Sequence, residues 1–399
     1  MRILEIITVP FFTPRGTSFS SLERTRAFAE LGHQVDILTY GIGEDVELPG
    51  LRIFRVPSLF VRSLRMGPSL PKLFFDVFLA WKTLWHLCFR GPYDLIHVHE
   101  ESAYWVSCMG FLHRAPVLYD MHSSLPEQLE NFGRGGGGAG RRILQGLFRR
   151  MEKRALACAR VVIVICPDLF ETVKRLVPAA SVHLIENLPV GWELSTPDEE
   201  QVAGLRSKLE LGELRSILYT GTFGENQGIE TTLDALALVL EERPETKLLL
   251  VGGSGLDLER VQKSVLERGL GAHVVIQPPR PYQEMPLYMA VADVLVSPRT
   301  RGTNTPLKIY SYLASGKPIV ATNLHSHTQV LNDSIACLVD PDPGALAAGL
   351  LRVLNEPDYA GRIGGAGAEV AERKYGIDRY MREVTGVLAE VQGSGSSVR

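Results

Sequence analysis

The sequence predicts an α/β protein made of two doubly wound domains, each a parallel sheet with helices on both faces. Three observations support this prediction. With 399 residues, the chain is too long for a single ordinary core. Short apolar runs alternate with helical stretches in both halves, as in βαβ units. Between the halves, residues 187–200 read NLPVGWELSTPDEE, and their prolines, glycine and acids favour a linker.

The first half contains seven apolar runs that we expect to be buried strands. Between the first two, residues 20–31 read SSLERTRAFAEL, with apolar residues at helical spacing and a glycine directly after them. The expected strands span residues 3–8, 35–39, 52–56, 95–98, 117–119, 161–165 and 182–185.

The second half repeats this alternation, with helices expected over residues 228–240 and 256–268. Its expected strands span residues 217–219, 248–251, 274–276, 294–296, 319–321 and 336–339. The predicted domains are residues 1–188, joined by a closing helix over 378–392, and residues 189–377, with a flexible tail over 393–399. A glycine-rich insert, GRGGGGAG over residues 133–140, is expected to be a flexible loop.

Composition and charge favour a globular protein with two unlike halves. Apolar residues make up 45% and charged residues 22% of the chain. The net charge of −3 is uneven: residues 1–188 carry 22 Lys and Arg against 18 Asp and Glu, and the remainder carries 20 against 27. A basic first half and an acidic second half predict different partners for each.

The cysteines and the start of the chain indicate a cytoplasmic protein. Five cysteines, at positions 88, 108, 158, 166 and 337, lack metal-ligand spacing, so we expect buried thiols in a reducing compartment. The first residues, MRILEIITVPFF, enter a strand pattern directly rather than a signal peptide. No run offers the ~20 uninterrupted apolar residues of a spanning helix.

Residues 293–323, DVLVSPRTRGTNTPLKIYSYLASGKPIVATN, contain the features that most directly indicate a ligand. Thr305 stands before Pro306, a sequence that predicts a capped helix beginning near the proline. Arg299, Arg301 and Lys308 surround that helix end, which favours an anion such as a diphosphate. The alternative is an ordinary capped helix whose basic residues are solvated.

Two glycine-rich turns in the second half strengthen the phosphate interpretation. Gly221-Thr222-Phe223-Gly224 and Gly252-Gly253-Ser254-Gly255 each follow an expected strand and precede an expected helix. Such turns are common, so each alone is a weak signal. Three candidate loops within one predicted domain favour a phosphate-bearing ligand there.

These motifs together resemble a known family. The runs YTGTFGENQGIETTLDAL, LLLVGGSG, ADVLVSP and PLKIYSYLASGKPIVAT, with AELGHQVDILTY, DLIHVHE and VLYDMH in the first half, are similar to retaining GT-B glycosyltransferases of the GT4 (group 1) type. The resemblance implies two Rossmann-like domains facing a cleft. It further implies a nucleotide-diphosphate sugar, with a UDP-sugar favoured, held by the second domain, an acceptor held by the first, and neither metal nor cofactor.

The resemblance also implies roles for individual residues. Lys308 would stabilise the departing diphosphate, His122 would reach the donor sugar, and Asp120 or Glu127 would orient the acceptor. The alternatives without a catalytic role are a His122 bonded to the backbone, and solvated carboxylates at Asp120 and Glu127. The expected donor-binding residues are Gly16, Gly221, Thr222, Gly252, Gly253, Arg280, Arg299, Arg301, Thr303, Asn304, Thr305 and Ser311.

The sequence departs from the family at three places. The family's two glutamates fall on Thr303 and Ser311, and its basic pair falls on Thr222 and Gln227. We expect Arg299 and Arg301 to replace the lost positive charge. Because both acids are missing, a non-catalytic nucleotide-sugar-binding subunit is an alternative. A UDP-sugar 2-epimerase of the same fold is a third.

The acceptor is expected to be a lipid or a cell-surface glycan precursor. Residues 141–160 are strongly basic with apolar interruptions, which favours contact with an anionic membrane at its inner face. The alternative is a solvated charged face. Residues 73–89, LFFDVFLAWKTLWHLCF, are rich in aromatics and are expected to form a core helix. Nucleic acid is not expected, because no known binding module accompanies the basic residues.

Overall fold

The computed structural model describes residues 1–13, 16–58, 70–126, 139–193 and 196–393. Glu127, most of the glycine-rich insert and the Gly/Ser tail lie outside the described residues. The chain divides into a first unit, Met1–Glu186 with Tyr380–Arg399, and a second unit, Asn187–Arg379. The sequence places the same boundary two residues later, after residue 188.

The first unit is built on a seven-stranded sheet in which all neighbouring strands are parallel. The seven strands predicted from the sequence are confirmed, and their ends move by at most two residues. From edge to edge the strands are β3 (Leu51–Arg55), β2 (Gln34–Thr39), β1 (Arg2–Ile6), β4 (Leu95–His99), β5 (Val117–Met121), β6 (Val161–Val164) and β7 (Val182–Leu184).

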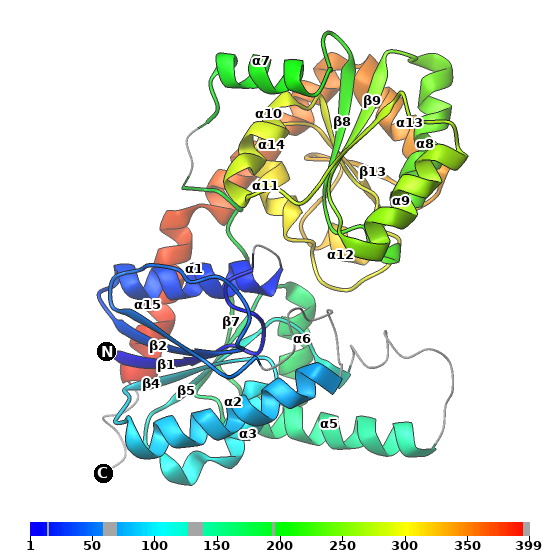
Figure 1. Cartoon of the computed structure of the whole chain (residues 1–399). Coiled ribbons are helices and arrows are strands. Elements are labelled where there is room, and N and C mark those ends of the chain that lie inside the picture. Colours follow the sequence, from blue (N-terminus) through cyan, green and yellow to red (C-terminus); the bar gives the residue numbers. More distant parts are fainter. Residues whose placement is uncertain (14–15, 59–69, 127–138, 194–195, 394–399) are drawn as a thin grey trace. The chain divides into compact units, whose positions relative to one another are not determined.

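Helices cover both faces of this sheet (Figure 1). One face carries α1 (Thr17–Glu30) and α15 (Ile377–Gly393); the other carries α2 (Leu70–Phe89), α3 (Ser102–Cys108), α5 (Ala139–Cys158) and α6 (Pro167–Leu176), with a short turn η1 (Gly110–Leu112). Side chains alternate between the two faces of a strand. Leu4 and Ile6 of β1 therefore join an apolar core with Phe75 and Leu79 of α2, whereas Glu5 faces α1.

The second unit is built on a six-stranded sheet, again parallel throughout. The six predicted strands are confirmed, as are the helices expected after the first two of them. The strand order is β10 (Val274–Gln277), β9 (Thr246–Gly252), β8 (Arg215–Gly221), β11 (Val294–Ser297), β12 (Ile319–Thr322) and β13 (Cys337–Val339).

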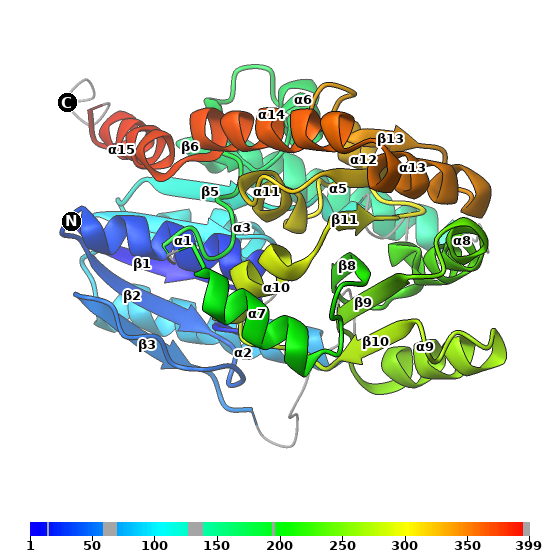
Figure 2. The same ribbon diagram turned by 90° about the horizontal axis from the view of Figure 1, so that it is seen from above.

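Two apolar clusters lie on opposite faces of the second sheet, as Figures 1 and 2 show for its helices. One cluster includes α8 (Ile229–Glu242), α9 (Gly255–Glu267) and α13 (Pro343–Asn355); the other includes α7 (Glu199–Lys208), α10 (Met285–Val291), α11 (Lys308–Ala314) and α14 (Pro357–Tyr375). The short elements are η2 (Glu225–Gln227), η3 (Tyr282–Glu284) and α12 (His325–Thr328).

In each sheet, the order in which the chain adds strands reverses once, from one side of the first strand to the other. In the first unit the chain moves from β1 outwards to β3 and then resumes beside β1 with β4; in the second it resumes beside β8 with β11. Parallel α/β sheets bind ligands at the carboxyl ends of the strands at such a switch point. The ends of β1 and β4, and of β8 and β11, are therefore where functional side chains are expected.

The predicted cap at Thr305 is wrong. Helix α11 begins at Lys308 and its N-cap is Leu307, without a side-chain cap. The amide of Ile309 bonds to the carbonyl of Pro306 at 3.0 Å, so a tight turn occupies the residues that were expected to open the helix. The helix has only seven residues.

Burial of the cysteines is only partly as expected. Cys166 and Cys337 are buried, but Cys88, Cys108 and Cys158 are exposed on α2, α3 and α5. These three cysteines lie on the outer sides of helices whose inner sides fill the core, a distinction that an apolar run does not reveal. In the described part of the chain, no helix is both long and apolar enough to span a bilayer.

Candidate functional site

Lys308 is the most unusual side chain near the switch point of the second unit. Its Nζ is buried and, among the described residues, has no hydrogen-bond partner. It lies 3.6 Å from the centre of the Tyr219 ring, a cation–π distance. Burial, together with the nearby positive charge of Arg299, holds the pKa of Lys308 well below its ordinary value. An anionic group placed here would supply the counter-charge that the described residues do not.

Gly221, at the end of β8, leaves space beside this lysine. A Cβ at Gly221 would lie 3.3 Å from the Lys308 Nζ. Gly252, the last residue of β9, and Gly253, the next residue, have another reason to be glycine. A Cβ at Gly252 would lie 2.1 Å from the Gly221 carbonyl oxygen, and one at Gly253 would lie 2.1 Å from the Phe223 ring. Packing of the two loops against each other therefore requires Gly252 and Gly253, whereas phosphate contact by them remains a prediction.

Arg299 holds the loop between β11 and α11. Its Nη1 donates to the carbonyl of Asn304 at 2.7 Å, and its own carbonyl accepts from Thr322 at 2.6 Å. Burial lowers the pKa of this guanidinium. Arg299 is thus both a structural support of the loop and a positive charge close to Lys308. The loop is further fixed by Gln329, whose side-chain amide donates to the Thr303 carbonyl at 2.6 Å.

The other two arginines expected at this site lie differently. Arg301 is 72% exposed and its Nη2 is 3.7 Å from a carboxylate oxygen of Glu225. Arg280 follows the edge strand β10 and pairs with Glu284 at 2.8 Å. Among the contacts of the described residues, none links Arg280 or Arg301 to Lys308.

The residues at the family's altered positions make contacts with the protein itself. The Ser311 hydroxyl accepts from the amide of Val190 at 2.8 Å. The Tyr219 hydroxyl donates to the Thr222 carbonyl at 2.6 Å and lies 3.2 Å from the Gln227 side-chain oxygen. The Thr305 hydroxyl is buried with no partner among the described residues. Tyr219 is thus central to this site, and sequence reasoning missed it although it opens the run YTGTFG.

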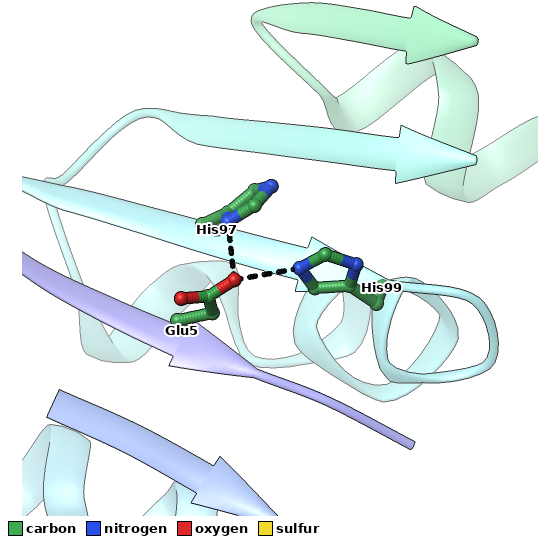
Figure 3. A group of neighbouring side chains, drawn as sticks. All are labelled: Glu5, His97 and His99. Atoms are coloured by element: carbon green, nitrogen blue, oxygen red, sulfur yellow. Dashed lines mark hydrogen bonds and ion pairs between the residues drawn. The ribbon is translucent and has the colours of Figure 1, made fainter. Parts of the chain in front are cut away.

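In the first unit, the carboxyl ends of β1, β4 and β5 carry a buried cluster of charged and histidine side chains. Glu5 on β1 accepts from the Nε2 of His99 at 2.9 Å and forms an ion pair with the Nδ1 of His97 at 3.1 Å, both on β4 (Figure 3). Thr25 on α1 donates to the other oxygen of Glu5 at 2.8 Å. Burial raises the pKa of Glu5, but the contacts with His97 and His99 outweigh it and lower this pKa to about 2.

Asp120 on β5 completes the charge balance of this cluster. Arg24 on α1 donates to it at 2.9 Å, and both side chains are almost completely buried. The Nε2 of His97 lies 3.6 Å from the same carboxylate. The pKa of Asp120 is held well below its ordinary value, with Arg24 the largest lowering influence, and the pKa of His97 is raised by its two carboxylates. Two carboxylates thus face the guanidinium of Arg24 and the ring of His97, whose protonated form they favour.

His122 lies at the edge of this cluster. Its Nε2 is 3.1 Å from the Nδ1 of His99 and 3.4 Å from Asp120. Burial lowers the pKa of His122 to about 3, so the ring is neutral at physiological pH. Because His99 donates from Nε2 to Glu5, its Nδ1 accepts a hydrogen bond from the His122 Nε2–H. The network therefore assigns the proton of His122 to Nε2 and leaves Nδ1 as an acceptor.

Asp120 was expected near the rim, but it is fully buried. Its partners are Arg24 and the histidines, so it is placed to position His122, and its expected role toward the acceptor stays a prediction. Glu127, the second candidate carboxylate, lies outside the described residues. Gly16 directly precedes α1, is exposed, and adopts a φ of 48° that suits glycine. Its expected contact with the donor stays a prediction.

Two groups in this cluster have ligand atoms close enough to hold a metal ion: Glu5, His97 and His99, and His99, Asp120 and His122. The chemistry of the donors fits poorly, however. A dication would lie beside the buried guanidinium of Arg24, which already pairs with Asp120, and it would compete with the protonated form of His97 that the two carboxylates favour. The arrangement instead suits a hydrogen-bonded network that fixes His122.

Sequence reasoning missed Glu5, His97, His99 and Arg24. A signal was present: the strand RILEI has one acid among apolar residues, and the run LIHVH places two histidines two residues apart, on one face of a strand. That these faces meet depends on β1 lying beside β4, with Glu5 opposite His97.

Comparisons with known proteins identify the family and the fold. Residues 16–187 match the model of the glycosyl transferase 4-like domain, and residues 215–356 match that of glycosyl transferases group 1. A phosphatidyl-myo-inositol mannosyltransferase of Mycobacterium tuberculosis is 26% identical over 412 residues, covering 100% of this chain and 99% of the relative.

A second relative and a solved structure extend the comparison. The GDP-mannose-dependent alpha-(1-6)-phosphatidylinositol monomannoside mannosyltransferase of Mycolicibacterium smegmatis is 29% identical over 218 residues, covering 52% of this chain and 56% of the relative. The structure of sucrose-phosphate synthase from Thermosynechococcus elongatus superposes with a TM-score of 0.80 at 23% identity, covering 99% of this chain and 100% of that one. Because the two family models together match most of the chain and the fold is shared, this protein belongs to the group 1 (GT4) glycosyltransferases of GT-B fold.

Proposed function

We propose that this glycosyltransferase transfers a mannosyl group, with retention of configuration and without a metal ion, from a nucleotide-diphosphate sugar to the headgroup of an inositol phospholipid. The part of the proposal that concerns the donor rests on the buried Nζ of Lys308, which has no counter-charge among the described residues. The acceptor half is supported by the names of the two mannosyltransferases to which the chain is similar.

The described side chains support a division of roles. Lys308 and Arg299 stabilise the negative charge that develops on the diphosphate as the sugar leaves, from a site that already excludes water. The nucleotide lies along the loops after β8 and β9. His122, neutral and with Nδ1 as an acceptor, receives a hydrogen bond from a sugar hydroxyl. The acceptor oxygen attacks the face that the diphosphate leaves, so no separate protein base is required.

The donor is tested by a thermal-shift screen of the purified protein against GDP-mannose, UDP-glucose and ADP-glucose. The sequence favours a UDP-sugar, whereas the GDP-mannose-dependent relative favours GDP-mannose. We expect GDP-mannose to raise the unfolding temperature, because a ligand at 100 times its Kd stabilises the folded state by about 2.7 kcal/mol. A shift with UDP-glucose alone would support the UDP-sugar and contradict the mannosyl group. Mannosyl transfer to phosphatidylinositol is then followed with radiolabelled donor. Absence of any shift and of any transfer would contradict the proposal.

The substitutions at Thr303 and Ser311 motivate a second candidate, a subunit that binds nucleotide sugar without transferring it. Ser311 is engaged by the Val190 amide, so it offers the ligand a hydroxyl hydrogen and no carboxylate. The same assays separate the candidates. A thermal shift with neither transfer nor donor hydrolysis would favour the binding subunit, and any donor-dependent transfer would reject it.

The two arginines of the loop after β11 should differ in their effect on donor binding. Arg301 is exposed and weakly paired, so Arg301→Ala is expected to change the Kd for the nucleotide sugar less than about threefold. Arg299→Ala removes a buried charge close to Lys308 and the support of the Asn304 carbonyl, so it should weaken binding by about tenfold or more. Calorimetric titration measures both. Equal losses in the two variants would show that Arg301 does contact the donor.

A further inference from the structure

Helix α2 presents two apolar faces, although only one of them packs on the sheet. Its buried face carries Phe75 and Leu79. Its outer face carries six large apolar side chains, here called the aromatic stripe: Leu73, Val77, Trp81, Leu84, Trp85 and Phe89. Trp81 is 66% and Phe89 is 74% exposed. The expectation of a core helix is therefore only half correct.

The aromatic stripe is a concentration of apolar surface, not a scatter of single residues. Of the eleven exposed large hydrophobic residues in the described part of the chain, six belong to this one helix. Two more, Phe111 on η1 and Leu147 on α5, lie on elements of the same helical layer. Contiguous apolar patches of this kind mark interaction sites in soluble proteins.

The charges around the stripe favour one kind of partner. Helix α3 packs between α2 and α5, so the three helices form one layer (Figure 1). The described residues 145–158 of α5 expose Arg149, Arg150, Lys153 and Arg154, while their one acid, Glu152, is buried. On α2 the one acid is Asp76, paired with Lys72 and bonded to Tyr40. The outer surface of the layer is thus apolar, aromatic and positive.

We propose that the aromatic stripe of α2, together with the basic face of α5, is the surface by which the protein docks on an anionic lipid bilayer. Tryptophan rings insert at the level of the lipid headgroups, and cations attract anionic lipids. Each interaction alone gives weak membrane binding, and the two together give stable binding. A second copy of the chain fits less well, because a twofold contact through this layer would bring two sets of α5 cations together. The inference rests on the proposed function only in that a lipid acceptor would then lie in the same membrane.

Co-sedimentation of the full chain with vesicles tests this surface. The probes are vesicles of phosphatidylcholine alone and of phosphatidylcholine with phosphatidylglycerol, at low and high salt. We expect binding to the anionic vesicles at low salt. Trp81→Ser combined with Trp85→Ser should lower the partition coefficient by about tenfold or more. The control is Leu256→Ser combined with Leu266→Ser on α9, two apolar side chains that are more exposed than the tryptophans, and this variant should bind like the wild type.

The electrostatic half of the surface is tested in the same assay. Arg150→Gln combined with Lys153→Gln should weaken binding to anionic vesicles, most at low salt. Lys208→Gln combined with Lys263→Gln, exposed in the second unit, is its control. All variants should keep the wild-type unfolding temperature because every substitution is on the surface.

Three results would overturn the proposal: no binding of the wild type at low salt, equal binding of the double tryptophan variant, or a dimer that this variant dissociates without any lipid effect. The last would assign the stripe to a second copy. Mannosyl transfer to a soluble inositol phosphate separates this test from that of the function. Transfer without vesicle binding would reject the surface alone, and vesicle binding without transfer would reject the function alone.

Discussion

Lys308→Met is expected to make the protein more stable and nearly inactive. The Nζ of Lys308 is buried without a hydrogen-bond partner among the described residues, which costs free energy of folding. Methionine has a similar length and keeps a sulfur–aromatic contact with Tyr219. The substitution should therefore raise the free energy of unfolding by about 1–3 kcal/mol and lower kcat/KM by about 100- to 1,000-fold. Urea unfolding and a transfer assay measure the two effects.

A second lysine of the same unit provides the control. Lys317 donates to the carbonyl of Ala290 at 2.9 Å, so Lys317→Met breaks a hydrogen bond and should be neutral or destabilising. The Nζ of Lys317 contacts a carbonyl of α10 and is not part of the proposed diphosphate site. The kcat/KM of Lys317→Met should therefore remain near the wild-type value. A Lys308→Met variant that is less stable than the wild type, or that keeps its activity, would remove Lys308 from the proposed diphosphate site.

The pH dependence of donor binding provides an independent view of the same residue. Burial and Arg299 depress the pKa of Lys308 in the free protein, and a bound diphosphate raises it again. Lys308 should therefore take up a proton when the donor binds. The affinity for the donor should fall as the pH rises through the pKa of Lys308 in the complex. Calorimetry in two buffers of different ionisation enthalpy measures this uptake. It should be absent in Lys308→Met.

The structure shows which features the sequence could predict. Strand positions followed from apolar runs between turn residues, since buried parallel strands are apolar on both faces. The loop that contains Lys308 was predicted from its sequence motif. The start of α11 was not predicted, because the tight turn at Pro306 is set by how the loop packs around Arg299. The exposed face of α2 was not predicted either, because a helix that is apolar on all sides has no periodicity that separates its faces.

The buried cluster behind His122 illustrates the limit most clearly. Period-2 spacing places His97 and His99 on one face of β4, but their partners come from elements far away in sequence. Glu5 lies on β1, Asp120 on β5 and Arg24 on α1. Only the strand order, with β4 between β1 and β5, brings the two acids to either side of the histidines. Each residue alone fits an ordinary strand or helix.

Breaking the buried ion pair in this cluster is expected to have the largest effect on stability. Arg24→Met leaves Asp120 buried and ionised, with only the more distant His97 as a cation, and should cost about 3–5 kcal/mol. Arg24→Met combined with Asp120→Asn removes both charges and should recover most of that loss. Lys263→Met, which breaks the exposed pair with Glu267, should change stability by less than about 1 kcal/mol.

The pH dependence shows whether this loss comes from the uncompensated carboxylate. In the wild type, Arg24 keeps the Asp120 pKa well below 3.8, so the pair contributes its stability above that value and loses it as the pH falls through the folded pKa. In Arg24→Met, Asp120 can instead take up a proton and become neutral. The gap between the two proteins in urea unfolding should therefore narrow on acidification. A gap that stays constant from neutral to acid pH would mean that lost packing of the Arg24 side chain against Tyr380, and not the buried charge, explains the effect.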